Sequence, residues 1–285
     1  MESRLRPYRS VLYIPASKDR ALDKARGLPV DAIIFDLEDA APADEKDNAR
    51  ATLAAALVTG GYGQRSRIVR INGLDTSWGE ADARAVVDMD ADAVLLPKVN
   101  SAADVDALAA MTGDLPIWAM METPHGVMNA AEIAAHPKMA GFVMGTNDLA
   151  RGLQTRFRPD RQPLLTALGL CLLAAKAEGL IIVDGVYNAF KDEEGLAVEC
   201  SQGRDMGFDG KTLIHPAQID IANQVFAPSE ADIDLARRQI AAFEETEAAG
   251  QGVAVVDGKI VESLHVATAH ETLVKVKAIK LLQQG

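Results

Sequence analysis

Two apolar segments of the chain each lead into a single acid. "WAMMETPHG" (118–126) ends its apolar run at Glu122, and "FVMGTNDLA" (142–150) follows the same pattern with Asp148. A buried carboxylate without a partner costs several kcal/mol and usually takes up a proton. Two such acids therefore indicate either a shared cation or a reaction that uses their charge.

Neither acid stands beside a histidine or a cysteine, so the pair offers oxygen ligands. Such a pair suits a hard cation such as Mg²⁺, with water or substrate completing the coordination shell. The alternative is structural, because Glu122 and Asp148 could each pair with Arg70 or Lys98. The residues alone leave both interpretations open.

Polar residues also follow the other apolar segments. The acids of "DLED" (36–39) are candidates for partners of Arg70, for groups that surround a metal's ligands, or for charges at a helix N-terminus. His215 precedes a proline and is more typical of a positioned loop residue than of a base. The full set of polar groups at these positions is Tyr13, Ser17, Lys18, Arg20, Lys24, Asp36, Glu38, Asp39, Arg70, Asn72, Lys98, Glu122, Asn147, Asp148, Asp184 and His215.

Eight short apolar segments, each directly before one of these groups, are typical of buried strands. Alanine-rich segments with helical spacing lie between them, at 44–58, 101–111 and 164–179. Strict alternation of strand and helix predicts a parallel sheet. The predicted strands are 10–14, 32–38, 67–71, 93–98, 116–122, 141–146, 180–186 and 210–214.

Eight strand–helix units in about 215 residues match the size of a (β/α)₈ barrel, a fold whose chemistry lies at the carboxyl ends of its strands. The polar groups should then share one mouth. An open, doubly wound α/β sheet is the alternative. No Gly-x-Gly-x-x-Gly follows any predicted strand, which weakens the dinucleotide-binding form of that alternative.

The sequence after Phe226 follows a different pattern. Residues 227–252 predict a helix that begins after Ser229, residues 253–261 a hairpin around Asp257–Gly258, and residues from about 265 to 282 a final helix. This tail is too small for an independent core, so we expect it to pack on another surface. The predicted domains are a catalytic barrel over 1–226 and a C-terminal extension over 227–285.

Composition narrows the class of partner. The chain has 285 residues and a net charge of −12, which argues against nucleic acid and anionic membranes. It has no apolar stretch near the roughly 20 residues of a membrane span and no recognisable signal peptide. Cys171 and Cys200 fit neither a metal motif nor a disulfide framework, so a reducing cytoplasm is the expected location.

Several motifs occur in a fixed order over about residues 9–280. They are "RSVLYIPASKDRALDKA", "DAIIFDLEDAAPADEKDNAR", "VRINGLDT", "LLPKV", "METPHGVMNAAEIA", "GTNDLA", "IVDGVYNAFKDEEGL" and "GFDGKTLIHPAQI". Together they resemble the CitE-like family, the HpcH/HpaI aldolase/citrate lyase family. The resemblance implies a (β/α)₈ barrel whose C-terminal extension packs on a neighbouring subunit of a homotrimer or homohexamer. It also implies Mg²⁺, with Mn²⁺ as an alternative, and CoA thioesters of small hydroxy-dicarboxylic acids as substrates.

The resemblance assigns roles to individual residues. Glu122 and Asp148 would hold Mg²⁺, and Arg70 would face the thioester oxygen, with Glu38 and Asp39 also in the catalytic set. Backbone N–H groups around 145–147 could bind the substrate carboxylate. Contacts to CoA or substrate would come from Tyr13, Lys18, Lys24, Arg70, Asn147, Asp148, Ile214 and His215.

One motif departs from the lyases of this family. They carry "GKxxD", whose aspartate is an acid/base supplied by the neighbouring subunit, whereas this chain has "GKIVE" with Glu262. The extra methylene changes the reach of the acid by about 1.5 Å, and a misplacement of ~1 Å can cost about 10²-fold in rate. The resemblance therefore favours Mg²⁺-dependent hydrolysis of (3S)-malyl-CoA to malate and CoA. The alternatives are a lyase that cleaves malyl-, methylmalyl- or citramalyl-CoA, and a non-catalytic acyl-CoA-binding protein.

Overall fold

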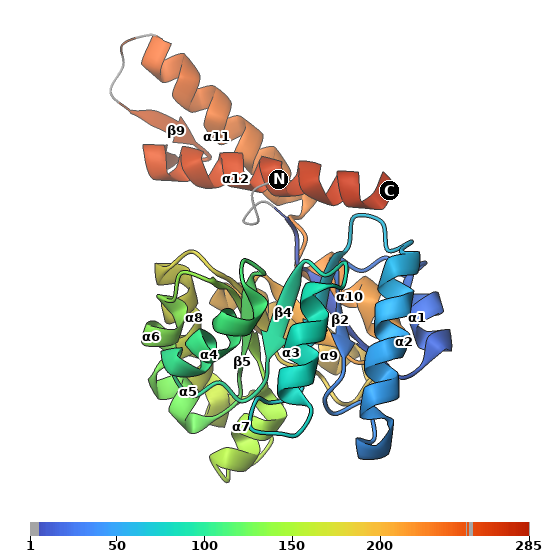
Figure 1. The fold of residues 1–285 in the computed structure, drawn as a ribbon. Coiled ribbons are helices and arrows are strands. Elements are labelled where there is room, and N and C mark those ends of the chain that lie inside the picture. The colour runs from blue at the N-terminus through green and yellow to red at the C-terminus, as the bar shows by residue number, and fades with distance from the viewer. Residues whose placement is uncertain (1–5, 249, 251–252, 285) are drawn as a thin grey trace. The chain divides into compact units, whose positions relative to one another are not determined.

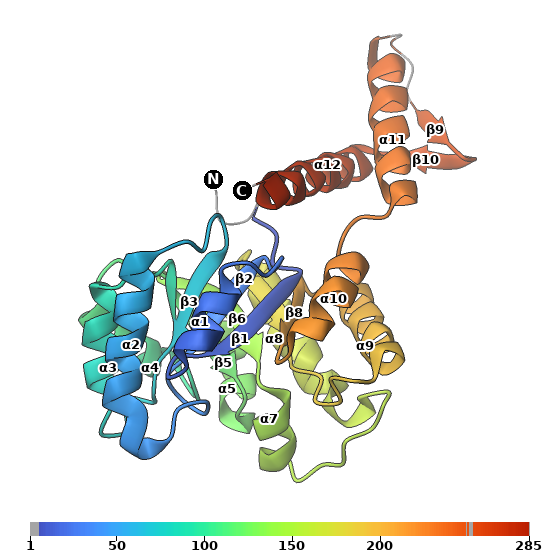
Figure 2. The same ribbon diagram turned by 90° about the vertical axis from the view of Figure 1, so that its right-hand side faces the viewer.

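Eight parallel strands close into a barrel in a computed structural model that describes residues 6–248, 250 and 253–284. The strands pair in sequence order, and β8 closes the ring on β1 (Figures 1 and 2). The predicted (β/α)₈ barrel is confirmed. The strands are β1 (Ser10–Pro15), β2 (Ala32–Asp36), β3 (Ser66–Arg70), β4 (Ala93–Leu96), β5 (Ile117–Met121), β6 (Met139–Met144), β7 (Ile181–Asp184) and β8 (Gly210–Leu213).

The strands are apolar on both faces because each face is covered. Alternate strand residues, such as Ile34, Leu95 and Val143, pack with one another as a cluster inside the barrel, and the intervening ones pack against the helices. Trp118 fills part of the interior, and Gly141 makes room for it. A Cβ on Gly141 would lie 2.7 Å from the indole, so only glycine fits there.

Helices alternate with the strands and form the outer layer. Their ends follow local chemistry: Ser101 and Asp104 form a capping box at α4, and α2 ends at Gly60 with a φ of 70°. The three predicted helices correspond to α2, α4 and α8. The helices of this unit are α1 (Asp19–Ala25), α2 (Lys46–Thr59), α3 (Gly79–Val87), α4 (Ala102–Thr112), α5 (Pro124–Met128), α6 (Ala130–Ala134), α7 (Thr146–Gly152), α8 (Leu165–Ala177), α9 (Glu193–Met206) and α10 (Ile219–Val225).

Several strands end earlier than predicted. The second ends at Asp36 rather than at residue 38, and the fifth at Met121 rather than at 122. At the second strand, the backbone leaves the ladder because the Glu38 N–H donates to Asp36 Oδ1 (2.9 Å) instead of to a neighbouring strand. Glu38 therefore stands two residues after β2, and Glu122 directly follows β5, so both acids lie in loops.

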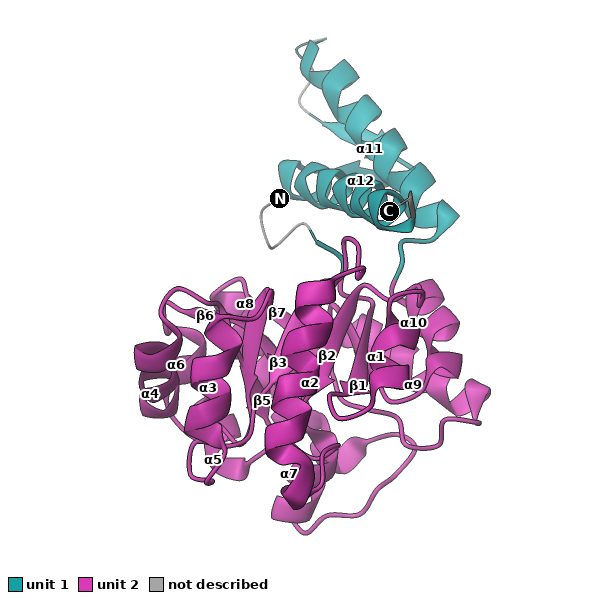
Figure 3. Cartoon of the chain, turned by 45° about the vertical axis from the view of Figure 1, so that its right-hand side comes forward, with its two compact units in different colours: residues 1–7, 227–285 teal, residues 8–226 magenta. Residues whose placement is uncertain are grey.

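The chain divides into two compact units (Figure 3). One is the barrel, Tyr8–Phe226, and the other contains the described residues from Ala227 onward. The second unit consists of α11 (Glu230–Ala248), the antiparallel strands β9 (Ala254–Val256) and β10 (Lys259–Val261), and α12 (Ser263–Gln284).

Local signals account for the elements of the second unit. The Ser229 hydroxyl accepts from the Asp232 N–H (3.1 Å) at the start of α11, and Asp257 and Gly258 both have positive φ in the hairpin turn. Its core is small, with Ala254, Val256 and Val261 as the buried members. Ile260 and Leu264 among others leave more than half of their surface exposed, so the unit offers apolar area to a partner.

Among the described helices, none is both long enough and apolar enough to cross a membrane.

Candidate active site

Arg70 is the centre of an ionic cluster at the carboxyl ends of the strands. The parallel register places Arg70, the last residue of β3, opposite Asp36, the last residue of β2. Two parallel bonds of 2.8 and 2.7 Å join the guanidinium to the Asp36 carboxylate. Its Nη1 lies 2.9 Å from Glu38 and 3.3 Å from Asp39. The fork geometry fixes the orientation of the guanidinium plane.

The cluster also fixes protonation states. Burial by itself opposes the charge on Arg70, but Asp36, Tyr13 and Glu38 raise its pKa well above the usual value, so it stays cationic. The Tyr13 ring lies 5.0 Å from the guanidinium, and its hydroxyl donates to the sulfur of Met120 (3.4 Å). Burial also raises the pKa of Tyr13, so its hydroxyl stays neutral. The site therefore contains a permanent cation beside a neutral hydroxyl donor.

Glu122 is buried, and its hydrogen bond offsets only part of the cost of burying a carboxylate. It is 3 % exposed, and its Oε1 accepts from the Lys98 N–H (2.8 Å). Burial, reinforced by the charges of Glu38 and Asp148, raises the pKa of Glu122 to about 7. Lys98 also binds Glu38 through its Nζ (2.5 Å), and its backbone has a φ of 54°. A non-glycine residue in this left-handed region is strained, which is common at functional sites.

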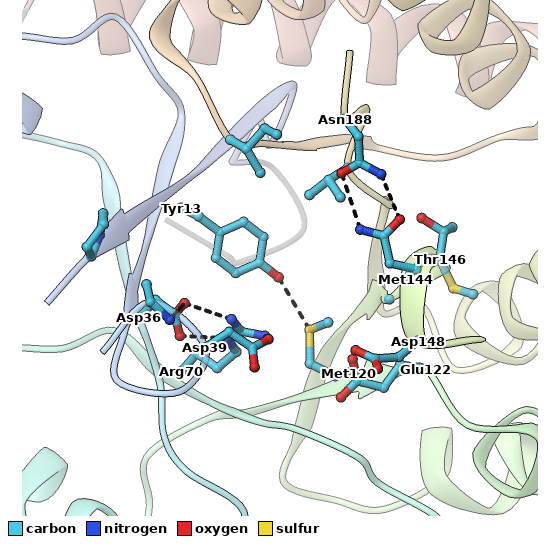
Figure 4. A pocket seen from close by; sticks show the side chains of 16 residues that line it. Tyr13, Asp36, Asp39, Arg70, Met120, Glu122, Met144, Thr146, Asp148 and Asn188 are labelled. Carbon is cyan, nitrogen blue, oxygen red and sulfur yellow. Dashed lines mark hydrogen bonds and ion pairs between the residues drawn. The ribbon is translucent and has the colours of Figure 1, made fainter. Parts of the chain in front are cut away.

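Glu122 and Asp148 lie side by side and point into the same pocket (Figure 4). Asp148 is in the first turn of α7 and pairs with Arg151 at 2.9 Å. Gly145 permits the close approach of this turn to Glu122, because a Cβ there would lie 2.4 Å from Glu122 Cβ. The predicted pair is therefore brought together by one tight packing contact.

These groups line one cavity of about 360 Å³, which we call the main cleft. Of the predicted site residues, seven line it: Tyr13, Asp39, Arg70, Glu122, Asn147, Asp148 and Ile214. Glu38, 8 % exposed, does not line it and lies against Arg70 and Lys98. Glu38 is thus placed to orient the two cations rather than to contact a ligand directly.

Besides Glu38, four predicted residues do not line the main cleft. Lys18 is exposed and lies 3.5 Å from Glu45, and Lys24 is exposed near the end of α1. His215 accepts from the Ala217 N–H (3.1 Å) through Nδ1, at the start of a short 3₁₀ turn. Glu262 belongs to the C-terminal unit.

Two strand-end groups expected at the shared mouth are elsewhere. Asp184 is fully buried and pairs with Arg161 (2.7 Å) and Lys211 (3.0 Å), because β7 and β8 place Asp184 beside Lys211 in register. Asn72 is buried against Asp82, to which it donates at 2.6 Å. Both side chains have structural partners inside the fold, so neither belongs to the polar groups at the mouth of the barrel.

Asn188 is a lining residue that the sequence analysis missed. It lies in the loop after β7 and exchanges two side-chain hydrogen bonds with Asn147, of 3.2 and 2.8 Å. The signal in the sequence is an amide shortly after a strand end, within "DGVYN". It was missed because the course of that loop cannot be derived from the pattern of apolar residues.

The residues present suit a divalent cation that keeps some of its own water. No group of three or more His, Cys, Asp or Glu side chains in the described part of the chain is arranged to hold a metal. Glu122 and Asp148 supply two carboxylates, and Mg²⁺ is commonly held by one or two carboxylates with water and substrate as further ligands. Burial is the main cause of the raised pKa of Glu122, but the charges of Glu38 and Asp148 add to it, and a cation would neutralise the negative potential that these charges create.

The raised pKa predicts an unusual dependence of stability on pH. Between pH 4.5 and about 7, folded Glu122 retains a proton that the unfolded chain has released, so stability falls as pH rises through this window. In chelator at pH 8, Glu122→Gln should therefore raise the free energy of unfolding by up to about 3 kcal/mol. At pH 4 the gain should vanish.

Denaturant unfolding at the two pH values measures this difference. Glu132→Gln, an exposed acid on α6, is the matched control and should change stability at neither pH. Equal stability of Glu122→Gln and the wild type at pH 8 would contradict the assigned burial cost.

Comparison with known proteins finds one family model and several relatives that match most of the chain. The family model for HpcH/HpaI aldolase/citrate lyase matches residues 9–216. The chain is 67 % identical over 279 residues to a (3S)-malyl-CoA thioesterase from Cereibacter sphaeroides, covering 98 % of each protein. It is 38 % identical to a citrate lyase subunit beta from Leuconostoc mesenteroides subsp. cremoris, covering 89 % of this chain and 88 % of the relative.

Solved structures are also similar to this chain over most of its length. A CitE protein from Mycobacterium tuberculosis, in complex with magnesium, acetoacetate and coenzyme A, superposes with a TM-score of 0.81 at 30 % identity. The match covers 96 % of this chain and 99 % of that one. RipC from Yersinia pestis gives a TM-score of 0.69 at 30 % identity, over 79 % of this chain and 97 % of that chain.

Proposed function

The chain belongs to the HpcH/HpaI aldolase/citrate lyase family, and we propose on this basis that it hydrolyses (3S)-malyl-CoA to malate and CoA with the help of Mg²⁺. The observation that carries the proposal is the main cleft, in which the Arg70–Asp36 fork faces the Glu122 and Asp148 carboxylates. The full-length identity to a malyl-CoA thioesterase supports the choice of substrate.

Arg70 is the group we assign to the thioester oxygen. Asp36 anchors Nε and Nη2, whereas Nη1 has two contacts, one with the buried Glu38 at 2.9 Å and a longer one with the exposed Asp39 at 3.3 Å. A substrate oxygen can replace that contact. Negative charge develops on this oxygen as water attacks, and a fixed cation there stabilises the transition state more than the substrate.

Glu122 and Asp148 are the residues that would hold Mg²⁺. A magnesium ion held there supplies Lewis-acid polarisation and a fixed orientation for the carboxylate and hydroxyl of the acyl group. Lys98 holds Glu122 in position through its backbone N–H and holds Glu38 through its ammonium. The acyl end of the substrate then lies beside Asp148 and Asn147, with the thioester towards Arg70.

The CoA portion leaves the cleft on the side of β1 and β8. Ile214 lines the cleft there, and the exposed Lys18 and Lys24 follow β1. We assign these lysines to the phosphates, which they meet as mobile point charges. The stack of His215 on Phe190, with ring centroids 4.6 Å apart, follows β8 and is assigned to the same portion.

One assay tests the proposed function. The protein is incubated with (3S)-malyl-CoA and Mg²⁺, and the products are separated. Free CoA with malate is the expected result. Acetyl-CoA with glyoxylate would instead establish a lyase, the alternative that the citrate lyase relatives favour. Absence of Mg²⁺-dependent turnover of any CoA thioester would make the chain a binding protein.

Glu262 is the residue we assign to the hydrolytic water. It lies between β10 and α12, and its exposed carboxylate has no partner among the described residues. Its own N–H donates to His265 Nδ1 (3.0 Å), which fixes the backbone at this position. We propose that it acts in the cleft of a neighbouring subunit of a homotrimer or homohexamer, because its unit exposes apolar side chains that need a partner.

Glu262→Gln should therefore abolish hydrolysis while substrate still binds, because the amide keeps the shape and removes the base. Glu262→Asp should move the product ratio towards carbon–carbon cleavage, since it restores the shorter acid of "GKxxD". Turnover and product ratio are measured at saturating (3S)-malyl-CoA, with binding followed by calorimetry.

Mixed oligomers test the action in trans. Glu262→Gln subunits and Arg70→Ala subunits, each inactive alone, should regain activity when exchanged into one oligomer. Verified exchange without recovery would mean that Glu262 serves its own barrel. An unchanged product ratio in Glu262→Asp would mean that side-chain length does not select the reaction.

A further inference from the structure

A second cavity adjoins the main cleft and has no role in the proposed reaction. Its volume is about 420 Å³, and we call it the second cleft. Four residues, Thr146, Asn147, Val186 and Asn188, line both cavities and so lie between them. These residues therefore form the boundary that the two cavities share.

The partition is held by the Asn147–Asn188 amide pair. The two side chains come from different elements, the start of α7 and the loop after β7, and exchange hydrogen bonds of 3.2 and 2.8 Å (Figure 4). Both are exposed, and each such bond is worth only about 1 kcal/mol. The pair is therefore a closed but weak bridge between the start of α7 and the loop after β7.

The second cleft combines apolar walls with three arginines and one acid. Arg156, Arg158 and Arg161 line it together with Glu199, whose carboxylate lies 2.7 Å from Lys211 and 3.7 Å from Arg161. Phe157, Pro163 and Leu164 supply the apolar part. Arg156 is exposed and has no ion-pair or hydrogen-bond partner in the described part of the chain. Arg161 is 5 % exposed, donates to Asp184 and Gln202 through Nη1 and Nε, and has a buried Nη2 without a partner. A buried donor of this kind is costly unless a ligand satisfies it.

We propose that Asn188, through its pair with Asn147, sets the size limit of the acyl group, and that the second cleft is a subsite for an acidic branch on that group. The inference rests on the proposed function, which places the hydroxyl-bearing carbon beside Asp148. Asn147 lines the same cleft as Asp148, so a branch on that carbon meets the amide pair. With the pair open, the carboxylate of a longer branch reaches the second cleft, which Arg156 and Arg161 line.

The test compares three CoA thioesters: (3S)-malyl-CoA and two analogues with a propyl or a carboxyethyl branch on the hydroxyl-bearing carbon. Asn188→Ala should raise kcat/KM for the carboxyethyl analogue by about tenfold or more, the scale of discrimination that a closed pocket gives. Each gain is expressed relative to the value for (3S)-malyl-CoA in the same variant, so a general loss of activity does not count as a change of size preference. The propyl analogue should gain less, because it cannot use the arginines.

A second substitution tests the contribution of the positive charge of Arg156. Adding Arg156→Ala to Asn188→Ala should remove the advantage of the carboxyethyl over the propyl analogue. Asn129→Ala, a half-buried asparagine between α5 and α6 that donates a single side-chain bond to the Asn100 carbonyl, is the control and should change none of these ratios. Asn188→Ser, too short to span the pair, should reproduce Asn188→Ala.

The outcomes separate this inference from the proposed function. If wild type hydrolyses malyl-CoA but neither Asn188 variant changes the size preference, the size limit lies elsewhere and the inference is wrong. Equal gains in kcat/KM for both analogues would show that the second cleft does not bind the carboxylate of the branch. If wild type does not hydrolyse malyl-CoA, calorimetric binding of the free branched and unbranched hydroxy acids in Mg²⁺ still decides whether Asn188→Ala admits the branch.

Discussion

Arg70→Lys is expected to lower turnover of (3S)-malyl-CoA by about 10²–10³-fold, the usual cost of losing one stabiliser of a developing oxyanion. Lysine keeps the charge but not the planar fork that Asp36 orients through two parallel bonds. An ammonium drawn to Asp36, Glu38 and Asp39 would stay with these acids and present no fixed donor to the substrate. The KM should change little, because most contacts to CoA lie elsewhere.

The matched control for this variant is Arg67→Lys. Arg67 stands on the same strand and also pairs with two acids, Asp90 and Asp92, but at the end of β3 away from the cleft. Steady-state kinetics of both variants measures kcat and KM separately. A raised KM with unchanged kcat in Arg70→Lys would show that the residue contributes to binding alone, and its catalytic role would have to be abandoned.

Asp148→Asn is expected to weaken Mg²⁺ binding by more than about 100-fold, since residues that merely support metal ligands already cost 10–100-fold when changed. Turnover should fall with the metal and recover in part at high Mg²⁺ concentration. The amide keeps the shape of the side chain, so folding should be unaffected. Calorimetric titration with Mg²⁺ and activity as a function of Mg²⁺ concentration are the two measurements.

Asp47→Asn controls for the loss of an ion pair. Asp47 stands in the first turn of α2 and pairs with Arg50, as Asp148 stands in the first turn of α7 and pairs with Arg151. This control should bind Mg²⁺ and turn over substrate as wild type does. Wild-type activity after treatment with EDTA, or in Asp148→Asn without added metal, would rule out the assigned site.

The barrel and the centre of the site could be predicted from the sequence because both depend on short-range patterns. Apolar segments alternating with helical ones fix eight parallel strands, and the parallel register then brings Arg70 opposite Asp36. Glu122 and Asp148 follow adjacent strands, so their proximity also results from strand order. Such placements need no knowledge of loop paths.

The remaining features depend on loops and on long-range pairing. Lys98 has a left-handed backbone conformation, which a lysine in the sequence does not predict. This residue nevertheless joins Glu122 to Glu38. Asp184 stands at the end of a strand, near the positions of the other acids, but it forms a buried ion pair with Lys211 on the next strand. Asn188 reaches the cleft through a loop. In each case the deciding partner is distant in sequence, so a local pattern does not identify it.

The packing of Trp118 against Gly141 has a practical consequence for following the two units of the chain by spectroscopy. The chain has two tryptophans, Trp78 and Trp118, and both belong to the barrel, whereas the sequence after Phe226 contains neither tryptophan nor tyrosine. Intrinsic fluorescence therefore reports the barrel alone, with the indole of Trp118 in its interior. Far-ultraviolet circular dichroism also includes the helices α11 and α12. A difference between the two signals during unfolding isolates the C-terminal unit without any label.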